Sequence, residues 1–242
     1  MSRVALVTGA ASGIGRATAR HLADQGLEVV CVDREPINDP PGPAITYDLE
    51  DVDGLEGLLA RAEDAAGPVD VLVNNAAMFV STPVSDVTVD QIRRTLSVNL
   101  MAPVMLAALV SRGMRARGWG RIVFISSIKD RFGERGSLAY DASKGGVSQA
   151  TRTLAVELGG EGVLVNAVAP GYVRTGMSVI DGENELESDW FKANYIESGR
   201  LPVGRAGEPE EIAALVGWLA SEASAYVNGT VIRADGGLSA AL

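Results

Sequence analysis

The sequence predicts an α/β fold, a single domain over residues 1–242 in which helices flank both faces of a doubly wound parallel β-sheet. Short β-branched runs alternate with longer helical patterns along the whole chain. Several of these runs are apolar at consecutive positions, as strands buried on both faces are. No linker, internal repeat or low-complexity tract divides the chain, so we expect one domain.

Seven short runs are predicted to form the strands of this sheet. They are rich in valine, isoleucine and other residues that suit a pleated, buried surface. In chain order the runs are Val4–Val7, Glu28–Val32, Ala44–Tyr47, Val69–Val73, Arg121–Ile125, Val163–Val168 and Thr230–Arg233. Between them, stretches with apolar residues at helical spacing predict helices over 13–25, 52–66, 89–117, 138–158 and 209–220.

The segment 176–200 does not fit the alternation of strands and helices. It contains an acidic run without basic residues, made of Asp181, Glu183, Glu185, Glu187 and Asp189. Two interpretations stay open at this point, a solvated acidic loop and a mobile cover over a functional site.

Composition excludes several classes of function. The net charge of −10 argues against a nucleic acid or an anionic membrane as a partner. Cys31 is the only cysteine, which excludes an intrachain disulfide and a Cys-rich zinc site. The only histidine, His21, lies in a helical pattern and is expected to be a packing or surface residue, so we expect no metal. The N-terminus has too short an apolar run for a signal peptide, and we expect a cytoplasmic protein without a membrane span.

A glycine-rich segment, TGAASGIG at Thr8–Gly15, follows the first strand and opens the first helix. Glycines let the backbone turn tightly and approach a pyrophosphate closely. The helix N-terminus then offers free N–H groups and the positive end of its dipole to that anion. The pattern therefore predicts a dinucleotide site and a Rossmann-type sheet, although its spacing is G-x-x-x-G-x-G instead of G-x-G-x-x-G.

Asp33 ends the second strand, 24 residues after Gly9. A carboxylate at this position accepts hydrogen bonds from both ribose hydroxyls of NAD and repels a 2′-phosphate. The neighbouring Arg34 would instead suit such a phosphate. We therefore predict NAD as the cofactor, with NADP as the alternative. A purely structural interpretation is that Asp33 only caps the end of the strand.

Together these residues resemble the short-chain dehydrogenase/reductase family, in its branch of chains of about this length, over essentially the whole sequence. Thr8–Gly15 matches the T-G-x-x-x-G-x-G loop of the family. Asn74–Ala77 matches its N-N-A-G motif with alanine in place of glycine, and Tyr140–Lys144 matches its Y-x-x-x-K motif. The departure at Ala77 puts the local loop geometry in doubt, because a methyl group there would crowd the backbone or narrow the site.

Three further features continue the resemblance. Ser127 precedes Tyr140 by 13 residues, the spacing of the serine that the family uses in catalysis. Asn99 stands where the family keeps a structural and catalytic asparagine. Pro170–Val173, followed by Thr175, resembles the P-G motif that closes on the nicotinamide.

The resemblance implies a short-chain NAD(P)-dependent alcohol dehydrogenase or ketoreductase, with Tyr140 as the acid and base. Tyr140 and Lys144 share one helix face because they are four residues apart. The lysine ammonium, together with a positive nicotinamide, is expected to lower the pKa of the tyrosine. Tyr140 would then take the proton of an alcohol as hydride leaves, or return it during reduction. Ser127 would hydrogen-bond the substrate oxygen, Lys144 would hold the nicotinamide ribose, and Asn99 would anchor a water that relays protons from Lys144.

The resemblance also implies a set of cofactor contacts along the carboxyl ends of the strands. The expected residues are Gly9, Ser12, Gly13, Ile14 and Gly15 at the pyrophosphate, Asp33, Arg34, Asp48, Leu49, Asn75, Ala76 and Ala77 toward the adenosine, and Tyr140, Lys144, Pro170, Gly171, Val173 and Thr175 toward the nicotinamide.

The substrate is indicated by fewer residues. Lys129 lies two residues after Ser127, where related enzymes place groups that face the substrate. It would bind a carboxylate, which suggests an anionic or polyhydroxylated substrate, or it is simply solvated. Met78 and Phe79 follow the fourth strand and either line the pocket, as we expect for Phe79, or pack in the core.

Two other functions stay open. Seven basic residues lie between Arg112 and Arg135, and related 3-oxoacyl-[carrier-protein] reductases dock an acidic carrier near such arginines. Against this, Glu161 replaces an arginine of those enzymes, Asp33 disfavours their NADPH, and the acidic run would repel the carrier. The second alternative is a catalytically silent NAD-binding protein. Finally, the resemblance implies a homotetramer or homodimer joined through the helices at 89–117 and 138–158.

Overall fold

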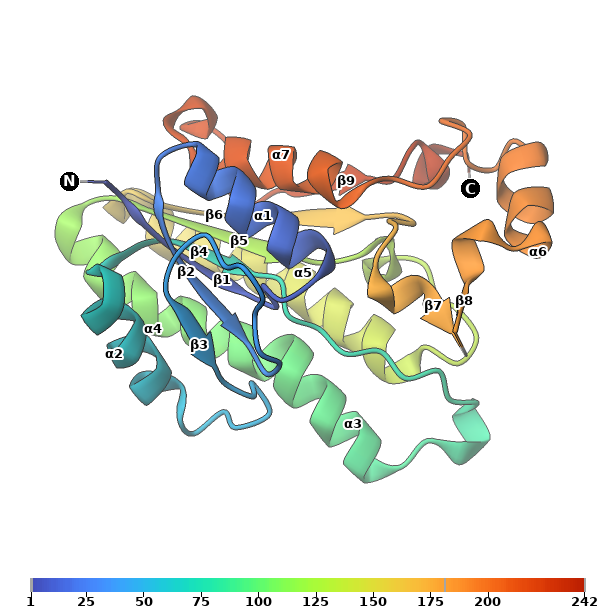
Figure 1. Ribbon diagram of the computed structural model, residues 1–242, viewed down its shortest axis with the longest axis horizontal. Coiled ribbons are helices and arrows are strands. Elements are labelled where there is room, and N and C mark those ends of the chain that lie inside the picture. The colour runs from blue at the N-terminus through green and yellow to red at the C-terminus, as the bar shows by residue number, and fades with distance from the viewer. Residues whose placement is uncertain (1, 181, 242) are drawn as a thin grey trace.

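The computed structural model describes residues 2–180 and 182–241, so Asp181 of the acidic run lies outside the described residues (Figure 1). Its centre is a parallel sheet with the strand order β3-β2-β1-β4-β5-β6-β9. The strands are β1 (Val4–Thr8), β2 (Glu28–Asp33), β3 (Ala44–Thr46), β4 (Val69–Asn74), β5 (Gly120–Ile125), β6 (Val163–Pro170) and β9 (Val231–Ala234). The order turns back between β1 and β4, as in a doubly wound sheet. The predicted fold class is confirmed.

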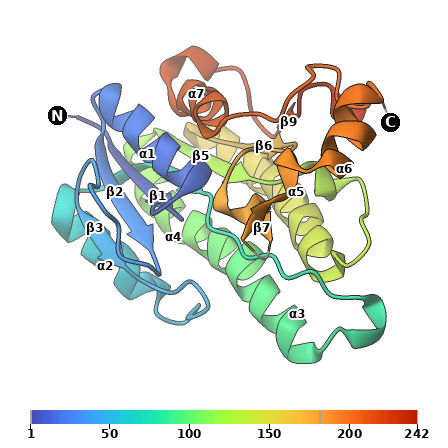
Figure 2. The ribbon, with the colours of Figure 1, turned by 45° about the vertical axis from the view of Figure 1, so that its right-hand side comes forward.

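Helices cover both faces of the sheet (Figures 1 and 2). On one face lie α1 (Gly13–Asp24) and α7 (Pro209–Ala220), whose Leu22 and Val216 are fully buried. On the other face lie α2 (Leu55–Ala66), α4 (Ala102–Arg117) and α5 (Leu138–Leu158). Because both faces are covered, the central strands β1, β4, β5 and β6 are mostly apolar and buried, which made them recognisable in the sequence.

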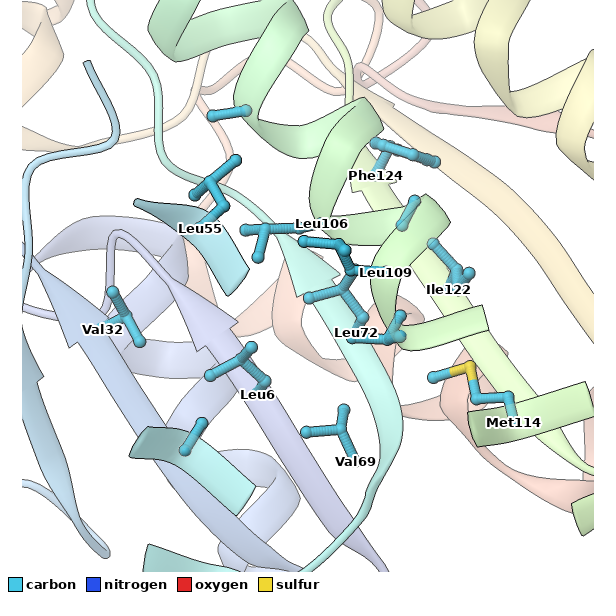
Figure 3. Packing of buried hydrophobic residues seen from close by; sticks show 14 of the residues in the cluster. Leu6, Val32, Leu55, Val69, Leu72, Leu106, Leu109, Met114, Ile122 and Phe124 are labelled. Carbon is cyan, nitrogen blue, oxygen red and sulfur yellow. The ribbon is translucent and has the colours of Figure 1, made fainter. Parts of the chain in front are cut away.

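The larger core lies between the sheet and the helices α2 and α4. Figure 3 shows Leu6 of β1 and Leu72 of β4 next to Leu106 and Leu109 of α4, with Leu55 of α2 at the edge of the cluster. Burying one such leucine side chain stabilises the fold by about 2 kcal/mol. This packing fixes the strands, and with them the strand ends at which the predicted site residues lie.

The helix predicted over 52–66 begins later than expected, at Leu55. The residues before it form a turn in which the Gly54 N–H donates to the Asp51 carboxylate at 3.2 Å and the Tyr47 hydroxyl donates to the Asp51 carbonyl oxygen at 2.6 Å. These side-chain bonds compete with the helical pattern of the backbone.

The helix predicted over 89–117 is not continuous. It consists of α3 (Val89–Leu96), a wide π turn at Ser97–Met101, and α4. Pro103 follows the turn and has no N–H to donate to the preceding turn of helix, which favours such an interruption.

Within the described residues, the stretch Val89–Arg117 is long and apolar enough to meet the length and hydropathy of a membrane span, but half of its most apolar window is buried inside this fold. A core helix meets the same criterion. Polar residues such as Ser97 and Asn99 interrupt the stretch, so it does not appear as an apolar run in the sequence.

The segment 176–200 is folded. It contains the short strands β7 (Val179–Ile180) and β8 (Glu183–Asn184), the one-turn helix α6 (Asp189–Phe191) and a π turn over Lys192–Glu197. Leu186 and Phe191 are buried in a small separate core that includes Ile128 from the turn after β5. Figure 1 shows this orange segment at the right-hand end of the molecule. The segment is therefore more than a loop, although the described acidic side chains Glu183, Glu185, Glu187 and Asp189 are exposed to solvent, and its role as a cover stays a prediction.

Candidate active site

The carboxyl ends of β1, β2, β4, β5 and β6 meet at one edge of the sheet, because neighbouring strands are parallel and in register. The segments that follow these strands contain most of the residues that the sequence predicted for a site. This edge is the usual position of a ligand in an open α/β sheet.

The glycine loop after β1 forms a close-fitting cradle. Gly9 and Gly13 have φ angles of +68° and +52°, in the left-handed region that favours glycine. A Cβ atom on Gly15 would lie 2.0 Å from the carbonyl oxygen of Gly9, so a larger residue does not fit there. Ser12, at the start of α1, makes no side-chain cap hydrogen bond, which leaves N–H groups of the first turn open to an anion. The cradle therefore fits a pyrophosphate.

Thr8 and Asn75 tie this cradle to the segment after β4. The Thr8 hydroxyl oxygen accepts from the backbone N–H groups of Asn75, at 3.0 Å, and Ala76, at 3.1 Å. The Asn75 side-chain amide donates to the carbonyl oxygens of Thr8, at 2.9 Å, and Gly9, at 3.2 Å. The side chain of Asn75 thus shapes the glycine loop, a role that the sequence did not predict.

Asp33 lies at the end of β2, and both of its carboxylate oxygens accept a backbone hydrogen bond. Oδ2 accepts from the N–H of Ala11 at 2.9 Å, and Oδ1 accepts from the N–H of Glu35 at 3.0 Å. Asp33 therefore does stabilise the turn, as the structural interpretation held, and each oxygen keeps acceptor capacity for a ribose hydroxyl. Arg34 is exposed and pairs with Glu35 at 3.6 Å.

A depression of about 610 Å³ lies beside Arg34, and its wall includes Asp48, the residue expected next to the adenine. Leu49 is buried, with 6% of its surface exposed. Its side chain belongs to the core cluster under α2, so a contact between Leu49 and a cofactor would come from its backbone.

Ser127, Tyr140 and Lys144 lie together where β5 ends and α5 begins. The Ser127 hydroxyl lies close enough to the Tyr140 hydroxyl to favour its ionised form. The Lys144 ammonium donates to the carbonyl oxygen of Ile125 at 2.8 Å and lies 5.5 Å from the centre of the Tyr140 ring. Phe79 packs edge-on against that ring, with 5.4 Å between the ring centres. The four predicted side chains are therefore neighbours.

Burial has the largest effect on the pKa values of Tyr140 and Lys144. It raises the pKa of Tyr140 to about 12, although the Ser127 hydroxyl acts in the opposite direction. Burial also lowers the pKa of Lys144 to about 8. Without a nicotinamide, the cost of removing the phenolate from water dominates the pKa of Tyr140. The expectation that Lys144 and a positive nicotinamide together lower this pKa stays a prediction.

Asn99 lies in the π turn and is buried, with 1% of its surface exposed. Its Oδ1 accepts from the Met78 N–H at 2.8 Å, and its Nδ2 donates to the Met78 carbonyl oxygen at 2.9 Å. Nδ2 also donates to the Ser143 hydroxyl at 3.2 Å. Asn99 thus links the segment after β4 to the helix that carries Tyr140 and Lys144.

The segment after β6 approaches the glycine loop. The side chain of Thr175 would lie 3.1 Å from a Cβ atom added to Gly13. A Cβ on Gly171 would lie 2.8 Å from the Cα of Asp235, which explains a glycine after Pro170. The side chain of Val173 is buried in the core under α7, so its backbone, and not its side chain, would meet a carboxamide.

Ala77 does not require the glycine that the family has at this position. Among the described residues, Asp39 is the only residue other than glycine with a positive φ. The backbone of Ala77 therefore has an ordinary conformation, and its side chain is half-buried.

Lys129 is not a free cation. Its ammonium forms an ion pair with Glu134, and its backbone N–H donates to the Ser127 hydroxyl oxygen at 3.2 Å. Glu134 was not predicted as a site residue, since a loop glutamate in FGERG gives no signal of its own.

A buried polar chain behind Ser127 was also missed. The Ser126 and Ser148 hydroxyls are 2.8 Å apart, and Ser148 donates to the Asp130 carboxylate at 2.8 Å. Asp130 in turn accepts from Arg233 at 3.4 Å. Two consecutive serines after a buried strand were the sequence feature that could have indicated this buried polar chain.

Comparisons with known proteins agree with this architecture. A family model described as Enoyl-(Acyl carrier protein) reductase matches residues 9–239. The cis-4-hydroxycyclohexanecarboxylate dehydrogenase of Sinomonas cyclohexanicum is 38% identical over 249 residues, covering 98% of this chain and 97% of that protein. The acetoacetyl-CoA reductase of Shinella zoogloeoides is 36% identical over 244 residues, covering 98% of each chain.

Among solved structures, a candidate NAD(P)-dependent gluconate 5-dehydrogenase from Beutenbergia cavernae, with NADP bound at low occupancy, has a TM-score of 0.89 and 38% identity. The match covers 98% of this chain and 97% of that one.

Proposed function

The chain belongs to the short-chain dehydrogenase/reductase family, and from this premise we propose that it interconverts a secondary alcohol and a ketone on a small molecule, with NAD(H). The observation that carries the proposal is the clustering of the Tyr140 and Ser127 side chains beside the buried amine of Lys144. This cluster follows β5, at the same sheet edge as the glycine cradle after β1.

The residues of this edge fit a nicotinamide dinucleotide. The cradle at Gly9–Gly15 would hold the pyrophosphate, Asp33 the adenosine ribose, Lys144 the nicotinamide ribose and Thr175 the carboxamide. When bound, the oxidised nicotinamide accepts a hydride and adds a positive charge that favours the phenolate form of Tyr140. Asp33 supports NAD over NADP because its carboxylate repels a 2′-phosphate. NADP is the alternative, since the Beutenbergia structure contains it.

The chemistry of the protein groups follows from their positions. During oxidation, the Tyr140 phenolate would take the O–H proton of the alcohol, while a bound nicotinamide would supply the hydride acceptor. During reduction, the Tyr140 hydroxyl returns that proton to the oxygen of the ketone. The Ser127 hydroxyl holds the same oxygen and stabilises the charge that develops on it. Asn99, through the Ser143 hydroxyl, keeps this part of α5 in place, and a water on its backbone would pass the proton from Lys144 to solvent.

A hydroxy acid is the substrate class that we propose, with a polyol or sugar and a cyclic alcohol as related possibilities. The names of the Sinomonas and Beutenbergia proteins describe hydroxylated carboxylates. Lys129, near Ser127, offers a cation to such a group, and Phe79 offers an apolar wall next to the Tyr140 ring.

The test is to follow formation of the reduced nicotinamide with NAD⁺ or NADP⁺ and a panel of hydroxy acids, polyols, cyclic alcohols and steroids. Turnover by the wild-type protein that is lost, by about a thousandfold or more, in Tyr140→Phe supports the proposal. Tyr226→Phe is the matched control, since Tyr226 is fully exposed. Full activity of Tyr140→Phe would overturn the assignment of Tyr140.

The second candidate is an NADPH-dependent 3-oxoacyl thioester reductase, of the carrier-protein or coenzyme A type. The relation to an acetoacetyl-CoA reductase favours it. Carrier docking is disfavoured because several of the arginines are paired with carboxylates of the chain itself, such as Arg115 with Glu161 at 2.5 Å and Arg117 with Asp70 at 3.1 Å. Oxidation of NADPH by acetoacetyl-CoA, with no activity on the alcohols, would select this candidate. Tight NAD binding with no turnover of either class would indicate a silent binding protein.

We also propose that residues 1–242 act as one catalytic unit in the cytoplasm, with 176–200 as a cover over the site. Self-association as a dimer or tetramer is supported by large apolar side chains that the two long helices expose. These are Met101 and Met105 at 49% and 44% exposure, and Leu138 and Val156 at 50% and 86%.

A further inference from the structure

Lys129 is a partly desolvated cation next to the proposed reaction centre. It lies in the turn that follows Ser127 and is bound to the Ser127 hydroxyl through its own N–H. Its side chain is only 16% exposed, and burial lowers the pKa of its ammonium. A cation in such surroundings interacts more strongly with a carboxylate than a solvated lysine does.

One carboxylate is paired with this cation, and two others act on it from a greater distance. Glu134, in the loop before α5, forms the ion pair. Asp141 follows Tyr140 in α5, and Glu185 lies in the segment 176–200, and both act on the Lys129 ammonium. Glu134 already neutralises the Lys129 ammonium, so a further carboxylate would meet an unfavourable charge unless Glu134 withdraws.

Glu134 is the carboxylate that is free to withdraw. Its side chain is 44% exposed, in a loop between Gly133 and Gly136. Its backbone is fixed, because its N–H donates to the Asp141 carboxylate at 3.0 Å and its carbonyl oxygen accepts from the Ser137 N–H at 3.3 Å. Rotation of the side chain alone thus takes its carboxylate from Lys129 into solvent.

We propose that Glu134 occupies, on Lys129, the position of a substrate carboxylate, and that a hydroxy acid binds by exchanging with it. The exchange keeps the local charge constant, so it avoids the repulsion that simple addition would meet. A neutral alcohol has no group that displaces Glu134 and gains nothing from Lys129. The pair then selects carboxylate-bearing substrates. This inference rests on the proposed dehydrogenase function and adds to it the element that recognises the substrate.

The experiment compares cis-4-hydroxycyclohexanecarboxylate with its neutral carboxamide, using the full-length protein and saturating cofactor. Lys129→Met is expected to raise KM for the acid by about tenfold or more and to leave KM for the amide within about twofold. Glu134→Gln removes the competing carboxylate and is expected to lower KM for the acid by about two- to fivefold. Lys129→Arg keeps the cation and should preserve the preference for the acid.

Glu157→Gln is the matched charge control, because Glu157 is exposed near the far end of α5. It changes the net charge as Glu134→Gln does and should leave both KM values unchanged. Equal effects of Lys129→Met on the acid and the amide, or a higher KM for the acid in Glu134→Gln, would overturn the exchange while the dehydrogenase function stands. No turnover of either compound while another alcohol of the panel is oxidised would overturn the inference alone, and no turnover of any alcohol of the panel would overturn it together with the proposed function.

Discussion

The side-chain amide of Asn99 pairs with both hydrogen-bonding groups of the Met78 backbone, accepting at 2.8 Å and donating at 2.9 Å. The Asn99 amide thus makes the two backbone hydrogen bonds that a neighbouring strand would otherwise make. These bonds fix the path of the chain immediately after β4. Since Nδ2 also reaches Ser143 on α5, one buried amide joins two walls of the candidate site.

Replacing Asn99 with alanine should therefore destabilise the fold and reduce activity together. Three hydrogen bonds are lost, and the Met78 N–H and carbonyl groups lose their partner, which predicts a decrease of about 2–4 kcal/mol in the free energy of unfolding. Urea unfolding measures this. In the control Asn194→Ala the lost bond is an exposed one to the Trp190 carbonyl oxygen, and the change should stay under about 1 kcal/mol. An equal loss in both variants would contradict the special role of Asn99.

Gly15→Ala should abolish tight binding of the dinucleotide. The added methyl group would lie 2.0 Å from the Gly9 carbonyl oxygen, so the cradle must open, at a cost of about 1–3 kcal/mol. Calorimetric titration with NADH should show a Kd at least about tenfold higher. Gly57→Ala, in α2 where nothing lies within 4 Å of the added atom, should instead be neutral or stabilising by up to about 1 kcal/mol. Wild-type affinity in Gly15→Ala would show that the cradle does not hold the cofactor.

Asp33→Asn should shift the cofactor preference toward NADP. Asparagine keeps an oxygen for the Ala11 N–H that Asp33 now accepts and removes the charge that repels a 2′-phosphate. The ratio of kcat/KM for NAD⁺ to that for NADP⁺ should fall by about 10- to 100-fold. Asp39→Asn removes an equal charge at a side chain that is 93% exposed and should not change the ratio. An unchanged ratio in Asp33→Asn would mean that Asp33 serves the turn alone.

Lys144 should make the stability of the cofactor-free protein depend on pH. Its pKa falls from 10.5 to about 8 on folding, so below pH 8 both states bind the proton and between pH 8 and 10.5 only the unfolded state does. Raising the pH through this window removes the cost of the buried charge and stabilises the fold by up to about 3 kcal/mol.

The measurement is urea unfolding from pH 7 to pH 10 for the wild-type protein and Lys144→Met. The difference between them should grow in favour of the wild type as pH rises. The control Lys192→Met, whose side chain is 51% exposed, should differ from the wild type by the same amount at every pH. A constant difference for Lys144→Met would show that Lys144 titrates normally.

Sequence patterns were sufficient for the sheet and for the site residues that follow its strands. Residues such as Val71 and Val165 are fully buried. Because buried strands are rich in apolar residues, they can be predicted from the sequence. A close approach to a pyrophosphate requires glycines at a strand end, which made Gly9 and Gly15 predictable. A ribose requires a hydrogen-bond acceptor at the next strand end, which made Asp33 predictable. The closeness of Tyr140 and Lys144 was predictable from their helical spacing, while their catalytic role was implied only by the resemblance to the family and stays a prediction.

Features that depend on long-range contacts were not predictable. The fold of 176–200 depends on Leu186 and Phe191 reaching Ile128, a contact across the chain. The pairing of Lys129 with Glu134 depends on how a glycine-flanked loop turns back on itself. The direction of the Tyr140 pKa depends on the depth of burial, which the spacing of residues does not give.

The π turn at Ser97–Met101 also determines which side of α4 faces the sheet. Such a turn carries one residue more than an α-helical turn, and one residue corresponds to about 100° of rotation about the helix axis. The 16 residues of α4 therefore present Leu106, Val110 and Met114 to the sheet only because that extra residue is there. Deleting one residue in this turn would rotate the whole of α4, bring polar side chains to the sheet and turn its leucines to solvent. The chain length between Asn74 and Gly120 is thus as much a determinant of this core as its hydrophobicity.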